Sequence, residues 1–207
     1  MAGPRATSTK PPERPPLRRD TIVDAAREIV RSDGLDGLSL RRLAADLGVT
    51  APALYAHVED KRDLLRAVAE VEFDRLVRRF EAVETQDPIE RIRAHCRAYV
   101  DHARENPELF DIMFLFPPDI GGAAVPEGAV LPAATRAFTV ALAAVDDAMR
   151  RGLLDGDDPL LVSLTLWTAT HGVASALQLG LALPTEVEER LIAASIDRLI
   201  QGWRSPA

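Results

Sequence analysis

Residues 38–65 read LSLRRLAADLGVTAPALYAHVEDKRDLL, and this stretch decides the fold. Ser39 stands where a helix N-cap is expected, and Leu38 and Leu43 occupy the two positions of a hydrophobic staple around it. Gly48 follows the apolar face of this helix and favours the left-handed conformation that ends helices. The pattern predicts a short helix that stops just before the glycine.

The same signals repeat directly after Gly48. Thr50 is placed to cap a second helix, Val49 and Leu54 can form its staple, and Pro52 falls in the first turn, where its missing N–H costs least. Two short helices joined by a tight glycine turn form a helix-turn-helix. An ordinary pair of core helices would show the same caps, so the caps alone leave both interpretations open.

The end of the stretch favours the first interpretation. The pattern Leu54-Tyr55-x-His57-Val58-x-x-Lys61-Arg62-x-Leu64-Leu65 closely resembles the end of the DNA-binding domain of the tetracycline-repressor (TetR) family. The resemblance extends from about residue 17 to about residue 76. It implies an all-α fold, with an N-terminal three-helix helix-turn-helix domain and a C-terminal helical bundle for ligand binding and dimerisation.

The charge distribution fits this division. The whole chain carries a net charge of −7, but residues 1–66 hold 12 basic and 10 acidic side chains, whereas residues 67–207 hold 13 and 22. A near-neutral to basic head on an acidic body is typical of a DNA-reading module joined to a regulatory domain. We expect a tail in residues 1–16, the DNA-binding domain in 17–66, and the ligand-binding and dimerisation domain in 67–207.

The tail contains five prolines and few apolar residues, which favours disorder. Its basic residues Arg5, Lys10 and Arg14 leave open the alternative of contact with DNA phosphates or a minor groove.

The resemblance implies that Tyr55 and His57, at the end of the recognition helix, and Lys61, which opens the next helix, contact the DNA backbone. Arg41 could bind guanine or a phosphate, or remain a solvated surface residue. The early recognition-helix positions are small, so DNA shape is expected to contribute to readout. The predicted DNA-binding residues are Ser39, Arg41, Thr50, Ala51, Pro52, Ala53, Tyr55, His57 and Lys61.

Apolar periodicity, caps and prolines predict further helices along the chain. A first helix, expected over about 17–33 and ended by Gly34, braces the recognition helices. A long irregular loop is predicted from Pro117 to Gly128. The other helices are expected at about 60–83, 87–105, 107–116, 131–151, 160–183 and 184–203.

Aromatic, imidazole and methionine side chains between residues 95 and 171 indicate either core packing or the wall of a ligand pocket. Trp167-x-x-x-His171-Gly172 resembles the tryptophan–histidine–glycine signature of one type of TetR-family ligand-binding domain. We expect no metal site, because His95 and His102 are two helical turns apart, about 10 Å. The predicted pocket residues are His95, Tyr99, His102, Phe110, Met113, Phe114, Phe138, Trp167 and His171.

Residues 160–183 contain no formally charged side chain. Their length would suffice to cross a membrane, but seven polar side chains are spread along them and basic flanks are missing. We therefore expect a helix buried on both sides, against its own body and against a second subunit, together with the last helix. The predicted dimer-interface residues are Leu164, Ala174, Leu177, Leu191, Ile192, Ile196, Ile200 and Trp203.

The sequence shows no GxSxG, P-loop or GxGxxG motif, so neither catalysis nor a cofactor is expected. The single cysteine and the lack of a signal segment suggest the cytoplasm, with no membrane partner. We expect a homodimeric repressor that releases its DNA operator on binding a small, largely apolar molecule. The alternatives are a helical small-molecule-binding protein or enzyme without DNA function, and a membrane-anchored protein.

Overall fold

The computed structural model describes residues 16–116 and 130–205, which are helical and contain no β-strand. The predicted loop 117–128 and all of the predicted tail except Pro16 lie outside these residues. The helices are α1 (Arg19–Gly37), α2 (Leu40–Leu47), α3 (Ala51–Tyr55), α4 (Lys61–Glu81), α5 (Pro88–Glu105), α6 (Pro107–Met113), α7 (Pro132–Arg150), α8 (Pro159–Leu177) and α9 (Thr185–Gly202).

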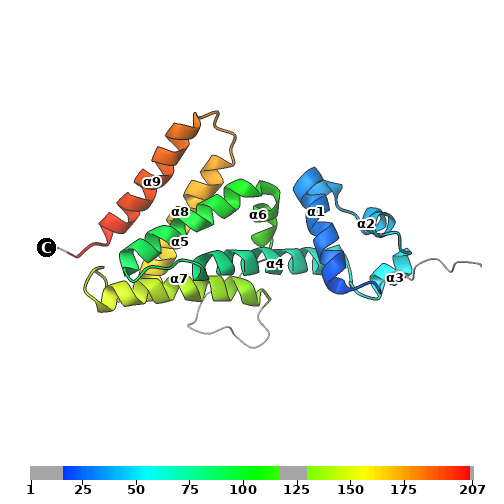
Figure 1. Ribbon diagram of the computed structural model, residues 1–207, viewed down its shortest axis with the longest axis horizontal. Helices are drawn as coiled ribbons and strands as arrows, with labels where there is room; N and C mark the ends of the chain where they lie inside the picture. The colour runs from blue at the N-terminus through cyan, green and yellow to red at the C-terminus, as the bar shows by residue number, and fades with distance from the viewer. Residues whose placement is uncertain (1–15, 117–129, 206–207) are drawn as a thin grey trace, which may run out of the picture.

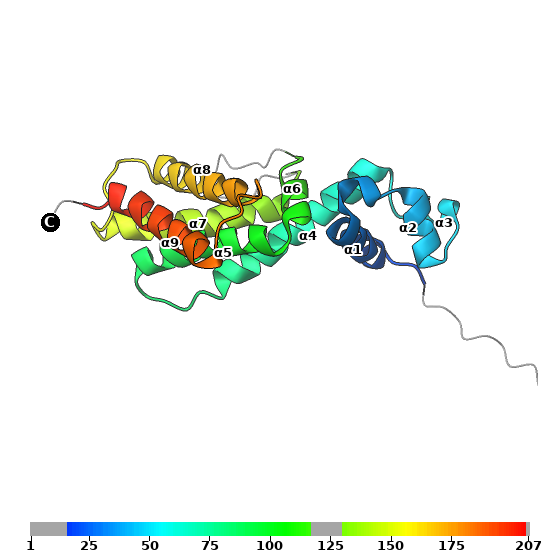
Figure 2. The same ribbon diagram turned by 90° about the horizontal axis from the view of Figure 1, so that it is seen from above.

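Helix α4 connects the two parts of the molecule. Helices α1–α3 form a head at one end of α4, and α5–α9 pack around its other end (Figures 1 and 2). With 21 residues, α4 spans roughly 30 Å at the ordinary helical rise. Its buried side chains Leu64, Leu65 and Val68 precede Phe73, Leu76 and Phe80 along the helix. One rigid element therefore contributes core residues to both parts of the molecule.

The ends of three predicted helices can be compared with the structure. The first helix does end at Gly34, as predicted, because that glycine has a non-helical backbone with φ 71°, and a further short helical piece within α1 extends to Gly37. Helix α6 stops at Met113, so Phe116 lies outside it. Helix α8 ends at Leu177, because the chain turns at Gly180, which has φ 68°, before the start of α9.

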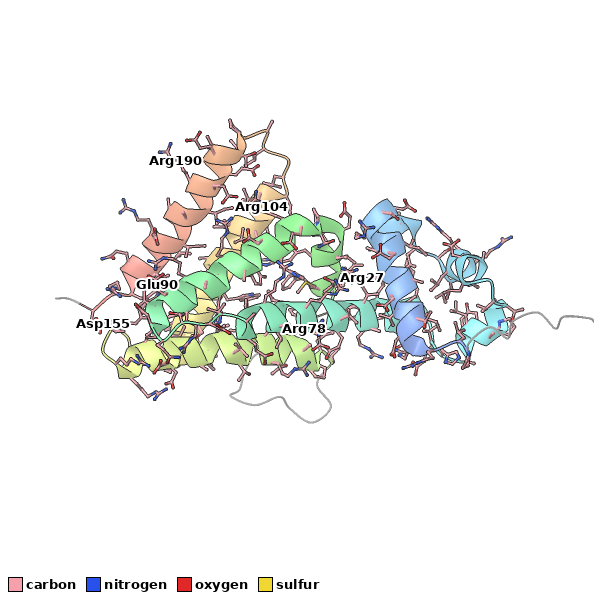
Figure 3. All side chains as sticks on the ribbon, viewed as in Figure 1. Arg27, Arg78, Glu90, Arg104, Asp155 and Arg190 are labelled. Carbon is pink, nitrogen blue, oxygen red and sulfur yellow. The ribbon has the colours of Figure 1, made fainter. Side chains whose placement is uncertain are left out.

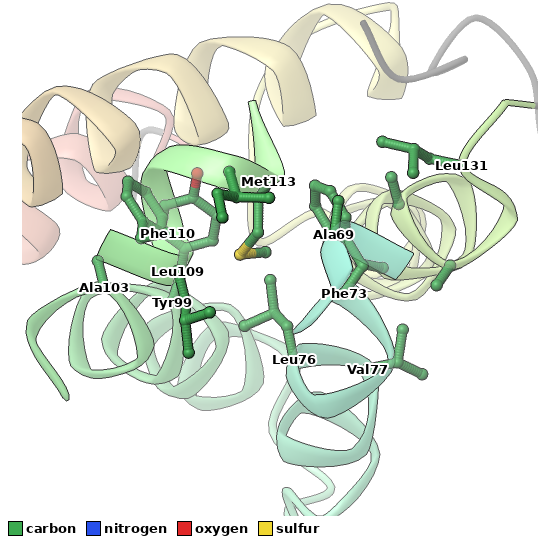
Figure 4. Packing of buried hydrophobic residues seen from close by; sticks show 14 of the residues in the cluster. Ala69, Phe73, Leu76, Val77, Tyr99, Ala103, Leu109, Phe110, Met113 and Leu131 are labelled. Atoms are coloured by element: carbon green, nitrogen blue, oxygen red, sulfur yellow. The ribbon is translucent and has the colours of Figure 1, made fainter. Parts of the chain in front are cut away.

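The core continues from the head into the body without a break. In the body, Phe73 and Leu76 of α4 face residues from α5 and α6, including Tyr99, Phe110 and Met113 (Figure 4). Met113 is fully buried and fills the space between these helices.

A buried ion pair joins α1 to α4. Glu72 is 0% exposed and accepts a hydrogen bond from Arg27, which is also buried (Figure 3 labels Arg27 at this junction). The Nε2 atom of His102 on α5 lies 3.4 Å from the second carboxylate oxygen. Burial lowers the pKa of His102 to about 4, so at neutral pH the ring is uncharged. Arg27 is thus the buried cation that compensates Glu72.

We predict that Glu72→Gln destabilises the protein by about 3–5 kcal/mol, because Arg27 then loses its buried carboxylate and keeps only the exposed Glu28 as a partner. Chemical denaturation followed by circular dichroism measures the loss. The double variant Arg27→Met/Glu72→Leu should recover most of it, since an apolar pair of similar size leaves no charge behind. Asp20→Asn, in the exposed Arg18–Asp20 pair, is the control and should change stability little. Equal losses in the single and double variants would contradict this account.

Candidate DNA-binding surface and ligand cavity

The two predicted caps shape the helix-turn-helix. The Ser39 hydroxyl accepts a hydrogen bond from the backbone N–H of Arg42 at 3.2 Å, and the Thr50 hydroxyl accepts one from the N–H of Ala53 at 3.4 Å. Between them, Gly48 adopts φ 64°, which places α3 at an angle to α2. Leu43 and Leu54 are fully buried beneath the turn. The opposite sides of α2 and α3 remain available to a partner.

The two neighbouring arginines of α2 have different environments. Arg42 is held by Asp33, by Asp46 and by the backbone carbonyl of Gly37. Arg41 is exposed, and among the described residues no hydrogen bond or ion pair engages its guanidinium. The five donors of Arg41 are therefore free to bind phosphate or the edge of a base.

The end of α3 differs from the prediction in one respect. Tyr55 is the last residue of α3 and is 55% exposed, which rules out a core role for its ring. His57 lies in the turn after the helix rather than in it, and its carbonyl accepts a hydrogen bond from Arg19. Lys61 opens α4 and its ammonium group donates to the carbonyl of Leu35 at 3.2 Å. Two donors of the ammonium group remain for another partner.

The side chain of Asp63 connects the elements that meet near the start of α4. Its carboxylate accepts two hydrogen bonds from Arg19, at 2.8 and 3.0 Å, and one from Arg66 at 2.9 Å. The Arg19 guanidinium lowers the pKa of Asp63 to about 2. The backbone N–H of Glu59, in the turn after α3, donates to the same carboxylate at 3.2 Å. The start of α1, this turn and the start of α4 therefore meet at Asp63.

A cavity lies in the body between α4, α5, α7 and α8. The volume of the cavity is about 80 Å³, and about 10–15 Å³ of such volume holds one water molecule. There is room for a small organic molecule. Its walls are largely apolar and consist of Phe73, Leu76, Phe80, Ile92, His95, Cys96, Tyr99, Phe114, Ala134, Ala137, Phe138, Ala141, Val145, Ser163, Leu166, Trp167 and Thr170.

Five of the nine predicted pocket residues line this cavity: His95, Tyr99, Phe114, Phe138 and Trp167. The other four do not.

Each of these four has another environment. His102 lies next to Glu72, because two further turns of α5 carry it toward the junction with the head. Met113 is enclosed in the core. His171 and Phe110 form a layer behind the wall, where their rings stack with centroids 5.6 Å apart.

This second layer orients the wall. The Tyr99 hydroxyl lies 2.8 Å from Nδ1 of His171. Burial raises the pKa of Tyr99 and lowers that of His171, so a neutral phenol and a neutral imidazole share this hydrogen bond. The His171 ring also contacts Phe114 and Trp167, with centroid distances of 4.6 and 5.7 Å.

The sequence analysis did not predict the α4 wall of the cavity, and on α7 it predicted only Phe138. The three cavity residues of α4 belong to its apolar stripe and read as core. On α7, Ala134, Ala137 and Ala141 recur at helical spacing and face aromatic residues of the other helices. Because these small side chains lie opposite large ones, the cavity between them stays unfilled. The helical spacing of the three alanines was the feature of the sequence that could have indicated it.

Comparison with known families fits both parts. Residues 22–68 match the bacterial regulatory proteins of the tetR family, and residues 92–201 match a tetracyclin repressor-like C-terminal domain. The chain belongs to the TetR family.

Relatives of this TetR-family chain extend the match. An uncharacterized HTH-type transcriptional regulator from Mycobacterium tuberculosis is 31% identical over 159 residues, which cover 75% of this chain and 68% of that protein. The class D tetracycline repressor protein of Escherichia coli is 49% identical over 53 residues, so the match spans only 26% of this chain and 24% of that repressor. A solved structure of a protein of unknown function from Rhodococcus sp. RHA1 has a TM-score of 0.77 at 27% identity, and the match covers 95% of this chain and 100% of that one.

The structure corrects part of the dimer interface predicted for this TetR-family chain. Ala174, Ile192, Ile196 and Ile200 are buried within the single chain, because these sides of α8 and α9 face their own body. Leu164, Leu177 and Trp203 are half-buried, and Leu191 is 41% exposed.

The outer sides of the same two helices carry other exposed apolar residues, including Leu161 and Val187. Helix α8 is apolar and long enough to cross a membrane, yet only 28% of its most apolar window is buried in the single chain.

Proposed function

We propose that this protein is a sequence-specific DNA-binding transcriptional regulator, a cytoplasmic repressor that releases its operator on binding a small, largely apolar molecule. One observation carries the proposal: a helix-turn-helix head with a free Arg41 and an exposed Tyr55 is joined through α4 to a body with an apolar cavity. Residues 17–66 would form the DNA-binding domain and residues 67–207 the ligand-binding and dimerisation domain. Membership of the TetR family supports both assignments.

Helix α4 provides the path from cavity to head. Phe73, Leu76 and Phe80 line the cavity, while Glu72, on the same helix, holds Arg27 of α1. A ligand that displaces the α4 wall also displaces the attachment of α1. Operator and ligand then favour different positions of the head, and each weakens the binding of the other by the same factor.

The protein would act as a homodimer through the outer sides of α8 and α9. These sides expose Leu161, Val187 and Leu191 in one chain, and exposed apolar patches of this kind mark interaction sites. A two-fold pair of these helices would form a four-helix interface and place the two recognition helices about one DNA turn apart. The alternative, a small-molecule-binding protein or enzyme without DNA function, predicts indifference to DNA at moderate salt.

Selection of genomic fragments by the purified protein identifies an operator and tests the proposal. Arg41→Ala should then weaken binding to that operator by about 1–3 kcal/mol and relax the preference at one base pair. Arg150→Ala, an exposed arginine at the far end of α7, is the matched control and should leave affinity unchanged. Equal weakening by Arg41→Ala on operator and random DNA would contradict base readout, and failure to enrich any fragment would contradict the proposed function.

For the interface, we predict that Leu161→Glu/Leu191→Glu yields a folded monomer, because both side chains are exposed in the single chain. Analytical ultracentrifugation measures the mass and circular dichroism the fold. Operator affinity should fall although the helix-turn-helix is unchanged. Leu115→Glu, exposed but outside α8 and α9, is the control and should stay dimeric. A monodisperse monomer for the unmodified protein at micromolar concentration would refute the interface.

A further inference from the structure

Two buried polar atoms in the cavity wall have no hydrogen-bond partner within residues 16–116 and 130–205. They are Nδ1 of His95 on α5 and the hydroxyl oxygen of Ser163 on α8. Each side chain is only 4% exposed. Buried polar atoms are nearly always paired, and each group left unpaired costs free energy. Two such atoms in one apolar wall indicate hydrogen bonds that an occupant of the cavity would complete.

The hydrogen-bond role of Nδ1 follows from the other side of the His95 ring. Nε2 lies 3.2 Å from the carbonyl oxygen of Phe80, and a carbonyl can only accept, so Nε2 carries the proton. Burial lowers the pKa of His95 to about 4, which keeps the ring neutral at physiological pH. Stacking on Phe80, with centroids 4.7 Å apart, holds its orientation. Nδ1 is therefore a fixed acceptor with an unshared electron pair.

The rest of the wall offers no charge to a ligand. Among the described residues, the lining contains no Asp, Glu, Lys or Arg. Burial raises the pKa of the Cys96 thiol, so it stays protonated. The Tyr99 hydroxyl is already hydrogen-bonded to Nδ1 of His171. An ionised ligand group would lose its hydration here without gaining a counter-charge, and that loss is large.

We infer that the ligand is a neutral, largely apolar alcohol or phenol, whose hydroxyl group donates a hydrogen bond to Nδ1 of His95. The Ser163 hydroxyl offers a second contact to a polar atom of the ligand. This assignment rests on the proposed function, in which the cavity is the effector site. It excludes fatty acids and other carboxylates as effectors, since an anion would meet the unshared pair of Nδ1.

Four probes of similar shape test the assignment by isothermal titration calorimetry at pH 7: 4-butylphenol, 4-butylanisole, butylbenzene and 4-butylbenzoate. The phenol should bind about tenfold more tightly than the anisole, which has the oxygen but no donor. The benzoate should bind most weakly. Equal affinity for phenol and anisole, tightest binding of the benzoate, or no binding of any probe would overturn the inference.

Two variants connect this preference to His95. His95→Phe removes the acceptor and should abolish the preference for the phenol over the anisole, while butylbenzene still binds. His95→Gln keeps one donor for Phe80 and one acceptor for the ligand, and should retain the preference. If His95→Phe does not fold, the relative affinities of the unmodified protein for the phenol and the anisole still test whether the ligand must donate a hydrogen bond.

Release of a fluorescent operator fragment, followed by anisotropy, separates the inference from the proposed function. Donor-selective binding without operator release would refute the effector role of the cavity and leave its ligand class standing. Operator release by all neutral probes alike would refute the ligand class and leave the effector role standing.

Discussion

The buried ion pair between Arg27 and Glu72 is the interaction on which the arrangement of the molecule depends. A carboxylate that is 0% exposed is tolerated only with a buried partner, and here the partner comes from the head while the carboxylate comes from the connecting helix. The pair therefore fixes where α1 crosses α4. Because neutral His102 of α5 lies beside the same carboxylate, head, connector and body meet at this point.

The cavity and the ion pair both include residues of α4, so this helix can couple the cavity to the head. Phe73 follows Glu72 directly in the sequence, so the two side chains point to different sides of one helical turn. One side supports the head and the other lines the cavity. A rigid helix moves as one unit, so a shift of the cavity side of α4 also shifts the side that holds the head. A ligand in the cavity would in this way alter the helix-turn-helix surface without touching it.

Local signals explain how much of the fold the sequence predicts. Ser39, Gly48 and Thr50 act on their own neighbours in the chain, and they do what their types suggest. Contacts between residues far apart in the sequence were harder to predict. Periodicity identified Ile196 as apolar, but it did not show whether that side of α9 faces its own body or a partner.

His102 illustrates the same limit within the candidate site. It shares a helix face with His95, and that face suggested a common pocket. Two turns along α5, however, carry it from the cavity to Glu72. Glu72 itself was recognisable as a charge within the apolar stripe of α4, which implies a buried partner, although the stripe does not say which one.

The most direct test of coupling through α4 fills the cavity without a ligand. Ala137→Leu extends a buried side chain of α7 into the cavity, whereas Ala143→Leu adds the same atoms on the exposed side of that helix. Operator affinity of both variants is measured by fluorescence anisotropy, with circular dichroism to establish that each is folded. We predict that Ala137→Leu weakens operator binding and that Ala143→Leu does not. Unchanged operator affinity in folded Ala137→Leu that no longer binds 4-butylphenol would contradict the account.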